Sequence, residues 1–231
     1  MQNPDQLDRP VNSPKWCYQI APAALLVLRR YGTRQYQRAL KKYLADLPGL
    51  KATYDKVRDL KRIPVTLPSG KLVRLSPGGQ NILLKQMIED FCSIFTPGGH
   101  VLYIGDADEK WMVFEREVLS NLGVVVDAHG KMPDLIVYMA DRNWLILLEA
   151  ASSHGPVDGK RHGELKCLFA SSTAGLVYIS CFSSRDEMRK YLNQIAWETE
   201  VWCADNPTHI IHFDGERLLG PYHSTAPVLP K

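Results

Sequence analysis

The fold is decided at residues 133–151, which read PDLIVYMADRNWLILLEAA. Residues 134–139 and 144–150 are rich in Val, Ile, Leu, Tyr and Trp, the composition that β-strands favour. Between them, Ala-Asp-Arg-Asn at residues 140–143 is typical of a turn. The segment therefore predicts a β-hairpin with a four-residue loop.

This hairpin would bring two carboxylates together. If the loop is symmetric, Asp134 at the start of one strand directly faces Glu149 near the end of the other. Two facing carboxylates destabilise a hairpin unless something neutralises them, and hard oxygen ligands of this kind suit magnesium. Such a metal lowers the pKa of a bound water and stabilises charge that develops on phosphorus. The alternative is a slipped register, which would leave two exposed strand-end carboxylates.

The elements around the hairpin predict a mixed α/β domain. After a helix at residues 80–95 and a strand at 101–105, the expected order from residue 109 is helix, three strands, helix, strand, which is an αβββαβ core. Trp144, Trp197 and Trp202 are expected in the core. The expected elements lie at 109–122, 124–127, 134–139, 144–150, 158–171 and 175–182, with a last helix at 184–198.

The N-terminal part has a different pattern. Helices are expected at residues 21–31, 33–46 and 50–62, with a break at Pro48-Gly49, and two β-prone runs follow at 65–67 and 72–75. Three short helices and a hairpin are the element order of a winged helix-turn-helix; the alternative is a helical lid packed on the larger domain. The boundary at Pro77-Gly78-Gly79 would divide the chain into a helical region, 1–76, that would bind DNA if it is a winged helix-turn-helix, and a larger domain, 77–231, that carries the paired acids and would be catalytic.

Composition sets the broad class of protein. The chain has 231 residues, a net charge of +3 and 45% hydrophobic residues, an ordinary globular balance, although basic residues gather at positions 29–62. Its five cysteines are dispersed without a CxxC pair, which favours reduced thiols and offers no support for an enzyme of Cys or His chemistry. We expect no signal peptide and no membrane span, and therefore a cytoplasmic protein.

Longer stretches carry a family resemblance: LSPGGQNILL at 75–84, VLYIGD at 101–106, HGKMPDLIVY at 129–138 and RNWLILLEAASSHGPVDGKRHGEL at 142–165. The paired acids resemble the PD-(D/E)XK nuclease superfamily, and the stretches resemble the BsuBI/PstI family of type II restriction endonucleases. The resemblance implies a magnesium-dependent homodimer that hydrolyses phosphodiester bonds of double-stranded DNA within a short palindromic site.

The resemblance also implies roles for individual residues. Asp134 and Glu149 match the two metal-binding acids, whereas the usual lysine, two positions after the second acid, is replaced by Ala151. Lys160 is the first candidate for that catalytic cation, although it could instead form an exposed pair with Glu164. Further candidates for accessory roles are Lys166, His154 and Glu115.

The surface that reads DNA stays open at this stage. Candidates lie on the third expected helix and beside the catalytic loop: Lys51, Thr53, Lys56, Arg58, Arg161 and His162. Because Ala151 stands in the lysine position, a second reading remains: a DNA-binding regulator or repair-associated protein whose nuclease core is inactive or not sequence-specific.

Overall fold

A seven-stranded mixed sheet forms the centre of the molecule, in the order β4-β3-β5-β6-β7-β8-β9. The computed structural model describes residues 20–106, 112–125, 131–152 and 155–214. Neighbouring strands run antiparallel except at the parallel pairs β6-β7 and β7-β8. The strands are β3 (His100–Ile104), β4 (Val113–Phe114), β5 (Leu135–Met139), β6 (Trp144–Ala150), β7 (Gly175–Phe182), β8 (Thr199–Cys203) and β9 (Ile210–Phe213).

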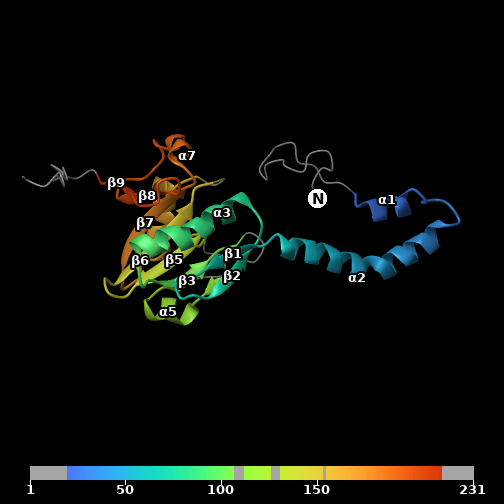
Figure 1. Ribbon diagram of the computed structural model, residues 1–231, viewed down its shortest axis with the longest axis horizontal. Helices are drawn as coiled ribbons and strands as arrows, with labels where there is room; N and C mark the ends of the chain where they lie inside the picture. Colours follow the sequence, from blue (N-terminus) through green and yellow to red (C-terminus); the bar gives the residue numbers. More distant parts are fainter. Residues whose placement is uncertain (1–19, 107–111, 126–130, 153–154, 215–231) are drawn as a thin grey trace, which may run out of the picture.

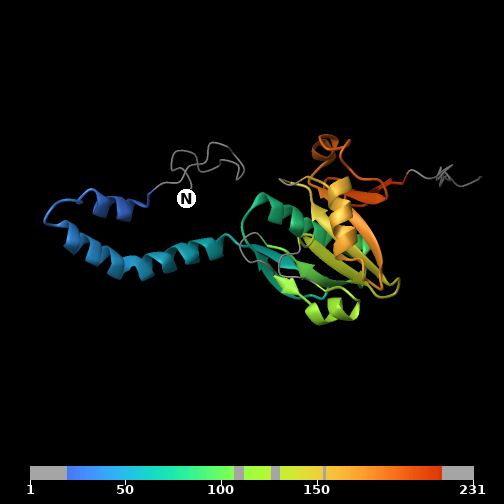
Figure 2. The same cartoon turned by 180° about the vertical axis from the view of Figure 1, so that it is seen from behind.

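Helices cover both faces of this sheet (Figures 1 and 2). On one face, α3 (Gly79–Gln86), the π-helical turn η1 (Met87–Phe91) and α4 (Cys92–Phe95) bury a cluster that includes Leu84 and Leu148. On the other face, α5 (Arg116–Asn121) and α6 (Gly159–Leu168) bury a second cluster that includes Leu147 and Leu165. Successive residues of a strand point to opposite faces, so the apolar runs at 135–139 and 144–148 can supply both clusters.

The central hairpin forms as the sequence predicts. The pairs of β5 and β6 run from Leu135–Leu148 to Met139–Trp144, which leaves residues 140–143 as the loop. Asn143 adopts φ 51°, the left-handed region that asparagine tolerates, and its Nδ2 donates to the carbonyl of Thr173 at 2.9 Å. The symmetric register, on which the pairing of the two acids depends, is confirmed.

The αβββαβ core is confirmed as a class, but its first two elements differ from the prediction. The first core helix is the run α3-η1-α4, and the first core strand is β3, which pairs with β5. Val124 and Val125 form no strand, and the remainder of the strand predicted at 124–127 lies outside the described residues. The segment predicted as helix 109–122 forms β4 and the short α5 within its described part. The pattern of hydrophobic residues alone did not distinguish the short strand β4 and the short helix α5 from one continuous helix.

The N-terminal part also departs from the prediction. After α1 (Pro22–Leu28), one helix, α2 (Tyr36–Leu60), continues through Pro48 where the sequence predicted a break. A proline removes one backbone hydrogen bond and can kink a helix without ending it. Strands β1 (Ile63–Thr66) and β2 (Leu72–Leu75) form the expected hairpin, which buries Val65 in the same cluster as α3. The hairpin therefore packs on the sheet domain.

The C-terminal part adds elements that the sequence did not reveal. The helix predicted at 184–198 is reduced to α7 (Arg185–Arg189), and the two strands β8 and β9 extend the sheet. Trp202 on β8 is fully buried, as expected. Trp144 and Trp197 were wrongly predicted in the core, since they are 41% and 68% exposed. Trp144 instead carries the guanidinium of Arg142 over its ring, 5.1 Å from the centroid.

Candidate active site

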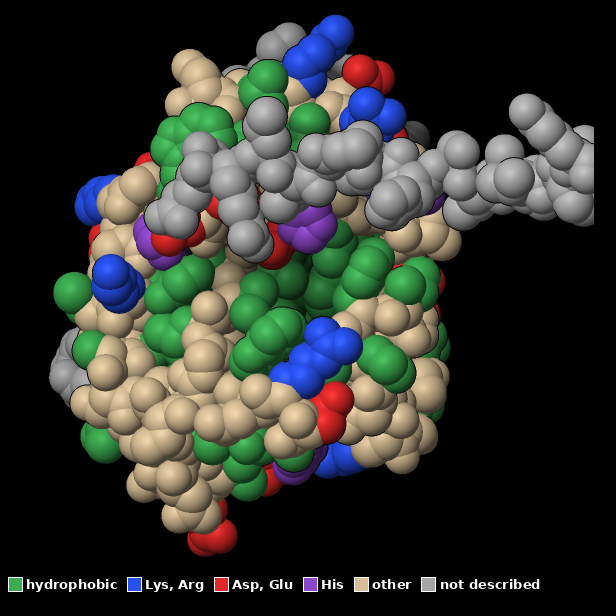
Figure 3. All heavy atoms as spheres, turned by 90° about the vertical axis from the view of Figure 1, so that its left-hand side faces the viewer, with side chains coloured by type: hydrophobic (Ala, Val, Ile, Leu, Met, Phe, Trp, Pro, Cys, Tyr) green, Lys and Arg blue, Asp and Glu red, His purple; other side chains and the backbone are tan. Residues whose placement is uncertain are grey.

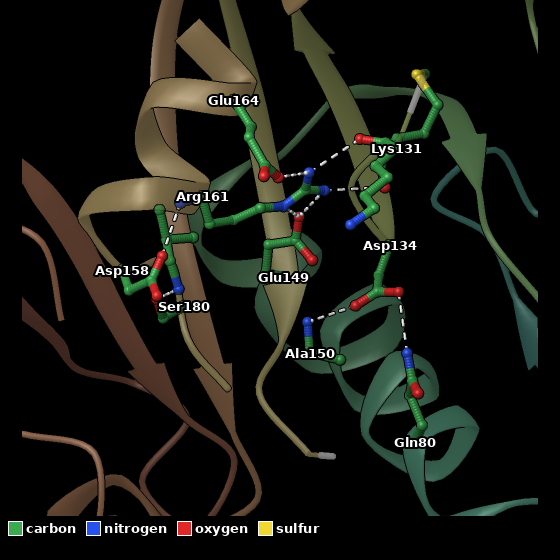
Figure 4. A network of polar contacts seen from close by, with 11 residues as sticks. Gln80, Lys131, Asp134, Glu149, Ala150, Asp158, Arg161, Glu164 and Ser180 are labelled. Atoms are coloured by element: carbon green, nitrogen blue, oxygen red, sulfur yellow. Dashed lines mark hydrogen bonds and ion pairs between the residues drawn. The ribbon is translucent and has the colours of Figure 1, made fainter. Parts of the chain in front are cut away.

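The two acids of the hairpin meet at one cleft of about 570 Å³. Asp134 lies one residue before β5, and Glu149 is the second-last residue of β6. The confirmed register of the hairpin, continued by one residue, places them opposite each other. Figure 4 shows both carboxylates from close by, with Glu149 between the helix that carries Arg161 and the strand that follows Asp134.

The surroundings of Glu149 disfavour its charge. Its side chain is only 15% exposed. Burial, followed by the nearby charge of Asp134, raises the pKa of Glu149 from 4.5 to about 7, although Arg161 acts in the opposite direction. A cation placed beside Glu149 would stabilise its charged carboxylate.

Asp134 is held from two sides. Its Oδ2 accepts a hydrogen bond from the backbone N–H of Ala150 at 2.8 Å, and its Oδ1 accepts one from Nε2 of Gln80 at 3.0 Å. Gln80 lies in the first turn of α3, so the first core helix reaches directly into the site (Figure 4). Gln80 was not among the residues predicted for the site, because the first core helix was predicted at residues 109–122, which contain the accessory candidate Glu115.

The start of α3 is fixed by a second polar network. Asp106 accepts hydrogen bonds from the backbone N–H of Ser76 at 3.0 Å and from Nδ2 of Asn81 at 2.9 Å, and the hydroxyl of Ser76 also donates to it. Ser76 and Asn81 are buried. Asp106 therefore anchors the turn from which Gln80 extends toward Asp134.

Arg161 on α6 contacts Glu149 more closely than any other cation. Its Nε and one terminal nitrogen donate to Oε1 of Glu149 at 2.9 and 2.5 Å. The helix begins at Asp158, whose Oδ1 accepts from the backbone N–H of Arg161 at 2.7 Å. Arg161, a candidate for DNA contact from the sequence, therefore lies against an acid of the site.

Lys160 lines the cleft, but it does not touch either acid. Its side chain is 82% exposed, and Nζ lies 3.9 Å from Oε1 of Glu164, the i,i+4 pair that the sequence allowed. Exposed pairs of this kind contribute little to stability, so the ammonium can leave Glu164 at small cost. Lys166 is exposed and is not among the residues that line the cleft. It stands six residues beyond Lys160, at about 240° around a regular helix.

Position 151 has a structural reason to lack a lysine. Ala151 is only 5% exposed and belongs to an apolar cluster with Phe182, Ile195 and Val201. A lysine there would have to place its ammonium among these side chains, where an unpaired charge is costly. The alanine is therefore the residue that the packing beside the end of β6 requires.

The remaining candidates lie apart from the acids or outside the described residues. Glu115 precedes α5 and lines a separate, smaller depression of about 90 Å³. The ring of His162 packs edge-on against Tyr178, with the centroids 4.4 Å apart. His154 is outside the described residues, as are the side chains of the candidates on α2, Lys51, Thr53, Lys56 and Arg58.

The residues of the cleft fit a hard divalent cation. Oε2 of Glu149 forms no hydrogen bond or ion pair with the described residues and points toward Asp134 (Figure 4). Within the part of the chain that the structure describes, no group of three or more metal-ligating side chains occurs. Two carboxylates with room for water around them are the donor set that magnesium accepts, because it keeps several waters when bound to protein.

Comparisons with known proteins identify the family. The model of the BsuBI/PstI restriction endonuclease domain matches residues 63–216, and that of the family's HTH domain matches residues 1–52. The chain is 48% identical over 222 residues to the type II restriction enzyme BsuBI of Bacillus subtilis, covering 96% of this chain and 70% of that enzyme. It is 33% identical over 225 residues to the type II restriction enzyme AplI of Arthrospira platensis (strain NIES-39 / UTEX 3086 / IAM M-135), covering 94% and 69%.

A solved structure shows the same fold. The SdaI restriction endonuclease superposes with a TM-score of 0.69 at 44% identity, over 96% of this chain and 70% of that one. The αβββαβ core and the acids at its central hairpin define a nuclease of the PD-(D/E)XK class. Together with the matches of both domains, they show that the chain belongs to the BsuBI/PstI family of type II restriction endonucleases, enzymes that bind and cleave DNA.

Proposed function

We propose that this enzyme hydrolyses phosphodiester bonds within a short palindromic site of double-stranded DNA, with magnesium held by Asp134 and Glu149. The observation that carries the proposal is the open Oε2 of Glu149, which points toward Asp134 in a cleft of about 570 Å³. Bound magnesium would supply an activated water and compensate the charge that develops on the phosphate. The enzyme's own residues orient the acids and the DNA.

Each side chain has a distinct part in this proposal. Asp134, fixed by Gln80 and the N–H of Ala150, presents its carboxylate in one orientation. Glu149 presents Oε2 while Oε1 is occupied by Arg161. Lys160 lines the cleft with an exposed ammonium, so it is a cation that can turn toward a phosphate oxygen. It replaces, in this proposal, the lysine that position 151 lacks.

DNA would also need a basic surface away from the acids. The face seen in Figure 3 has Lys and Arg side chains that are scattered and not gathered into a patch. Exposed basic residues gather at and just before the start of α2, at Arg34, Arg38, Lys41 and Lys42. We therefore assign the phosphate contacts to α2, where Lys51, Thr53, Lys56 and Arg58 remain candidates for reading bases.

A palindromic site implies a two-fold symmetric reader, so we propose a homodimer. No helix in the described part of the chain combines the length and apolar character that crossing a membrane requires. The cysteines that the structure describes, Cys92, Cys167, Cys181 and Cys203, are free thiols, which favours the cytoplasmic location expected from the sequence.

One digestion separates the candidate functions. The purified protein is incubated with unmodified plasmid or phage DNA, either with magnesium or with a chelator. Discrete fragments that form only with magnesium are expected. Random degradation would indicate a nuclease without sequence specificity, and intact DNA in all samples would favour the DNA-binding regulator.

A further inference from the structure

The guanidinium of Arg161 uses every hydrogen-bond donor that it has. Besides its two bonds to Oε1 of Glu149, it donates to the carbonyls of Lys131 and Met132, at 3.1 Å each, and to Oε2 of Glu164 at 3.4 Å. An arginine side chain has five N–H donors, and these five hydrogen bonds employ all of them. The side chain is only 18% exposed.

These bonds join three segments of the chain. The acceptors lie on β6, in the segment that leads into β5, and on α6 itself. Met132 is two residues before Asp134, so the same guanidinium holds one acid directly and the backbone beside the other (Figure 4). A planar, rigid fork of donors can fix both at once, which a flexible ammonium cannot do.

We propose that Arg161 is a positioning residue that holds Glu149 and the backbone preceding Asp134 as one unit, and so presets the two acids for the metal. The inference rests on the proposed function, in which Asp134 and Glu149 hold the metal. Groups of this kind, which orient metal ligands without touching the metal, commonly change metal affinity or activity 10–100-fold.

The contacts distinguish this role from that of a cation that grips the substrate. Arg161 would have to break bonds to Glu149 or to the carbonyls before it could bind a phosphate. Lys160, the preceding residue, has an 82% exposed side chain and one weak partner. Of these two neighbouring cations on α6, Arg161 is therefore fixed by its contacts, whereas Lys160 can move toward a substrate.

The test measures manganese and magnesium binding to the full-length protein without DNA, by titration calorimetry, for the parent, Arg161→Lys and Arg161→Ala. Both variants should bind metal about 10–100-fold more weakly. Cleavage at limiting metal should fall and recover partly with excess metal, while KM for DNA stays near that of the parent. Recovery by metal would not follow from a merely structural defect.

A matched arginine gives the control. Arg142, in the loop at the opposite end of the hairpin, has a 55% exposed side chain, and Arg142→Lys and Arg142→Ala should leave metal affinity unchanged. Metal affinity that is equal or tighter in the folded Arg161 variants would overturn the proposal. If Arg161→Ala does not fold, the metal affinity of Arg161→Lys alone tests the proposal.

The parent protein provides a measurement that does not depend on any variant. In a crystal structure with bound manganese, Arg161 should keep its contacts to Glu149 and to the carbonyls of Lys131 and Met132. Loss of these contacts would contradict a positioning role. If the parent binds no metal at Asp134 and Glu149, the proposed function itself is overturned. If the parent and the Arg161 variants bind metal equally well, only this inference is overturned.

Discussion

Glu149 makes the stability of the metal-free enzyme depend on pH. Its folded-state pKa of about 7 is above the ordinary 4.5, so the folded protein holds this proton more tightly than the unfolded chain does. The stabilisation that results is fully present below pH 4.5 and is lost as the pH rises to about 7.

The Glu149→Gln variant should therefore flatten the decline of Tm that the metal-free parent shows between pH 4.5 and about 7. Glutamine stays neutral and can still accept from Arg161. Thermal denaturation at a series of pH values measures the effect. The control is Glu187→Gln, because the side chain of Glu187 is 45% exposed. Parallel curves for the parent and Glu149→Gln would contradict the raised pKa.

Lys160 is the next test at the scale of single residues. If its ammonium meets the phosphate, Lys160→Ala should lower kcat about 10²–10³-fold, the loss expected for one stabilising group, while metal affinity is kept. Single-turnover cleavage measures this loss, and Lys190→Ala, exposed on the surface, serves as the control. A comparable loss in Lys166→Ala, with Lys160→Ala unaffected, would favour the second candidate instead.

At the scale of elements, the end of β6 explains the departure from the usual lysine position. Because Ala151 packs in a closed apolar cluster, Ala151→Lys should destabilise the fold by at least about 1–3 kcal/mol from overpacking alone. It should also fail to replace Lys160. Denaturant unfolding measures the change, with Ala170→Lys at an exposed position as the control. Full stability, together with activity restored in Lys160→Ala, would contradict this explanation.

Helix α3 makes a separate contribution through Gln80. The Gln80→Ala variant removes the side-chain hydrogen bond to Oδ1 of Asp134 and should weaken metal binding or cleavage about 10–100-fold. Gln86→Ala, at the last position of the same helix, is the matched control. Unchanged metal affinity and cleavage in Gln80→Ala would show that the aspartate is oriented without Gln80.

The sequence was sufficient for elements with a strong local pattern. The apolar composition of residues 134–139 and 144–150 and the four-residue turn between them predicted β5, β6 and their register, and β7 was predicted at its observed bounds, 175–182. The short β4 and α5 have too few residues for a clear period. The roles of Gln80 and Arg161 could not be predicted, because they depend on which helix packs beside the hairpin, a contact between residues far apart in the sequence.

At the scale of the whole molecule, the helical arm formed by α1 and α2 extends away from the nuclease core (Figure 1). The division at residues 76 and 77 remains a prediction. The burial of Val65 and Leu75 against α3 favours counting the β1-β2 hairpin with the nuclease core. In that arrangement the arm, α1 and α2, carries the basic surface, and the core carries the acids.

The proposed cleavage of DNA depends most on the two acids of the central hairpin. The most direct measurement compares magnesium-dependent cleavage of unmodified DNA by the parent, Asp134→Ala and Glu149→Ala, each shown to be folded by circular dichroism. We predict discrete fragments from the parent and none from either variant at any magnesium concentration. Fragments of the same pattern from a folded Asp134→Ala or Glu149→Ala variant would contradict the proposed site.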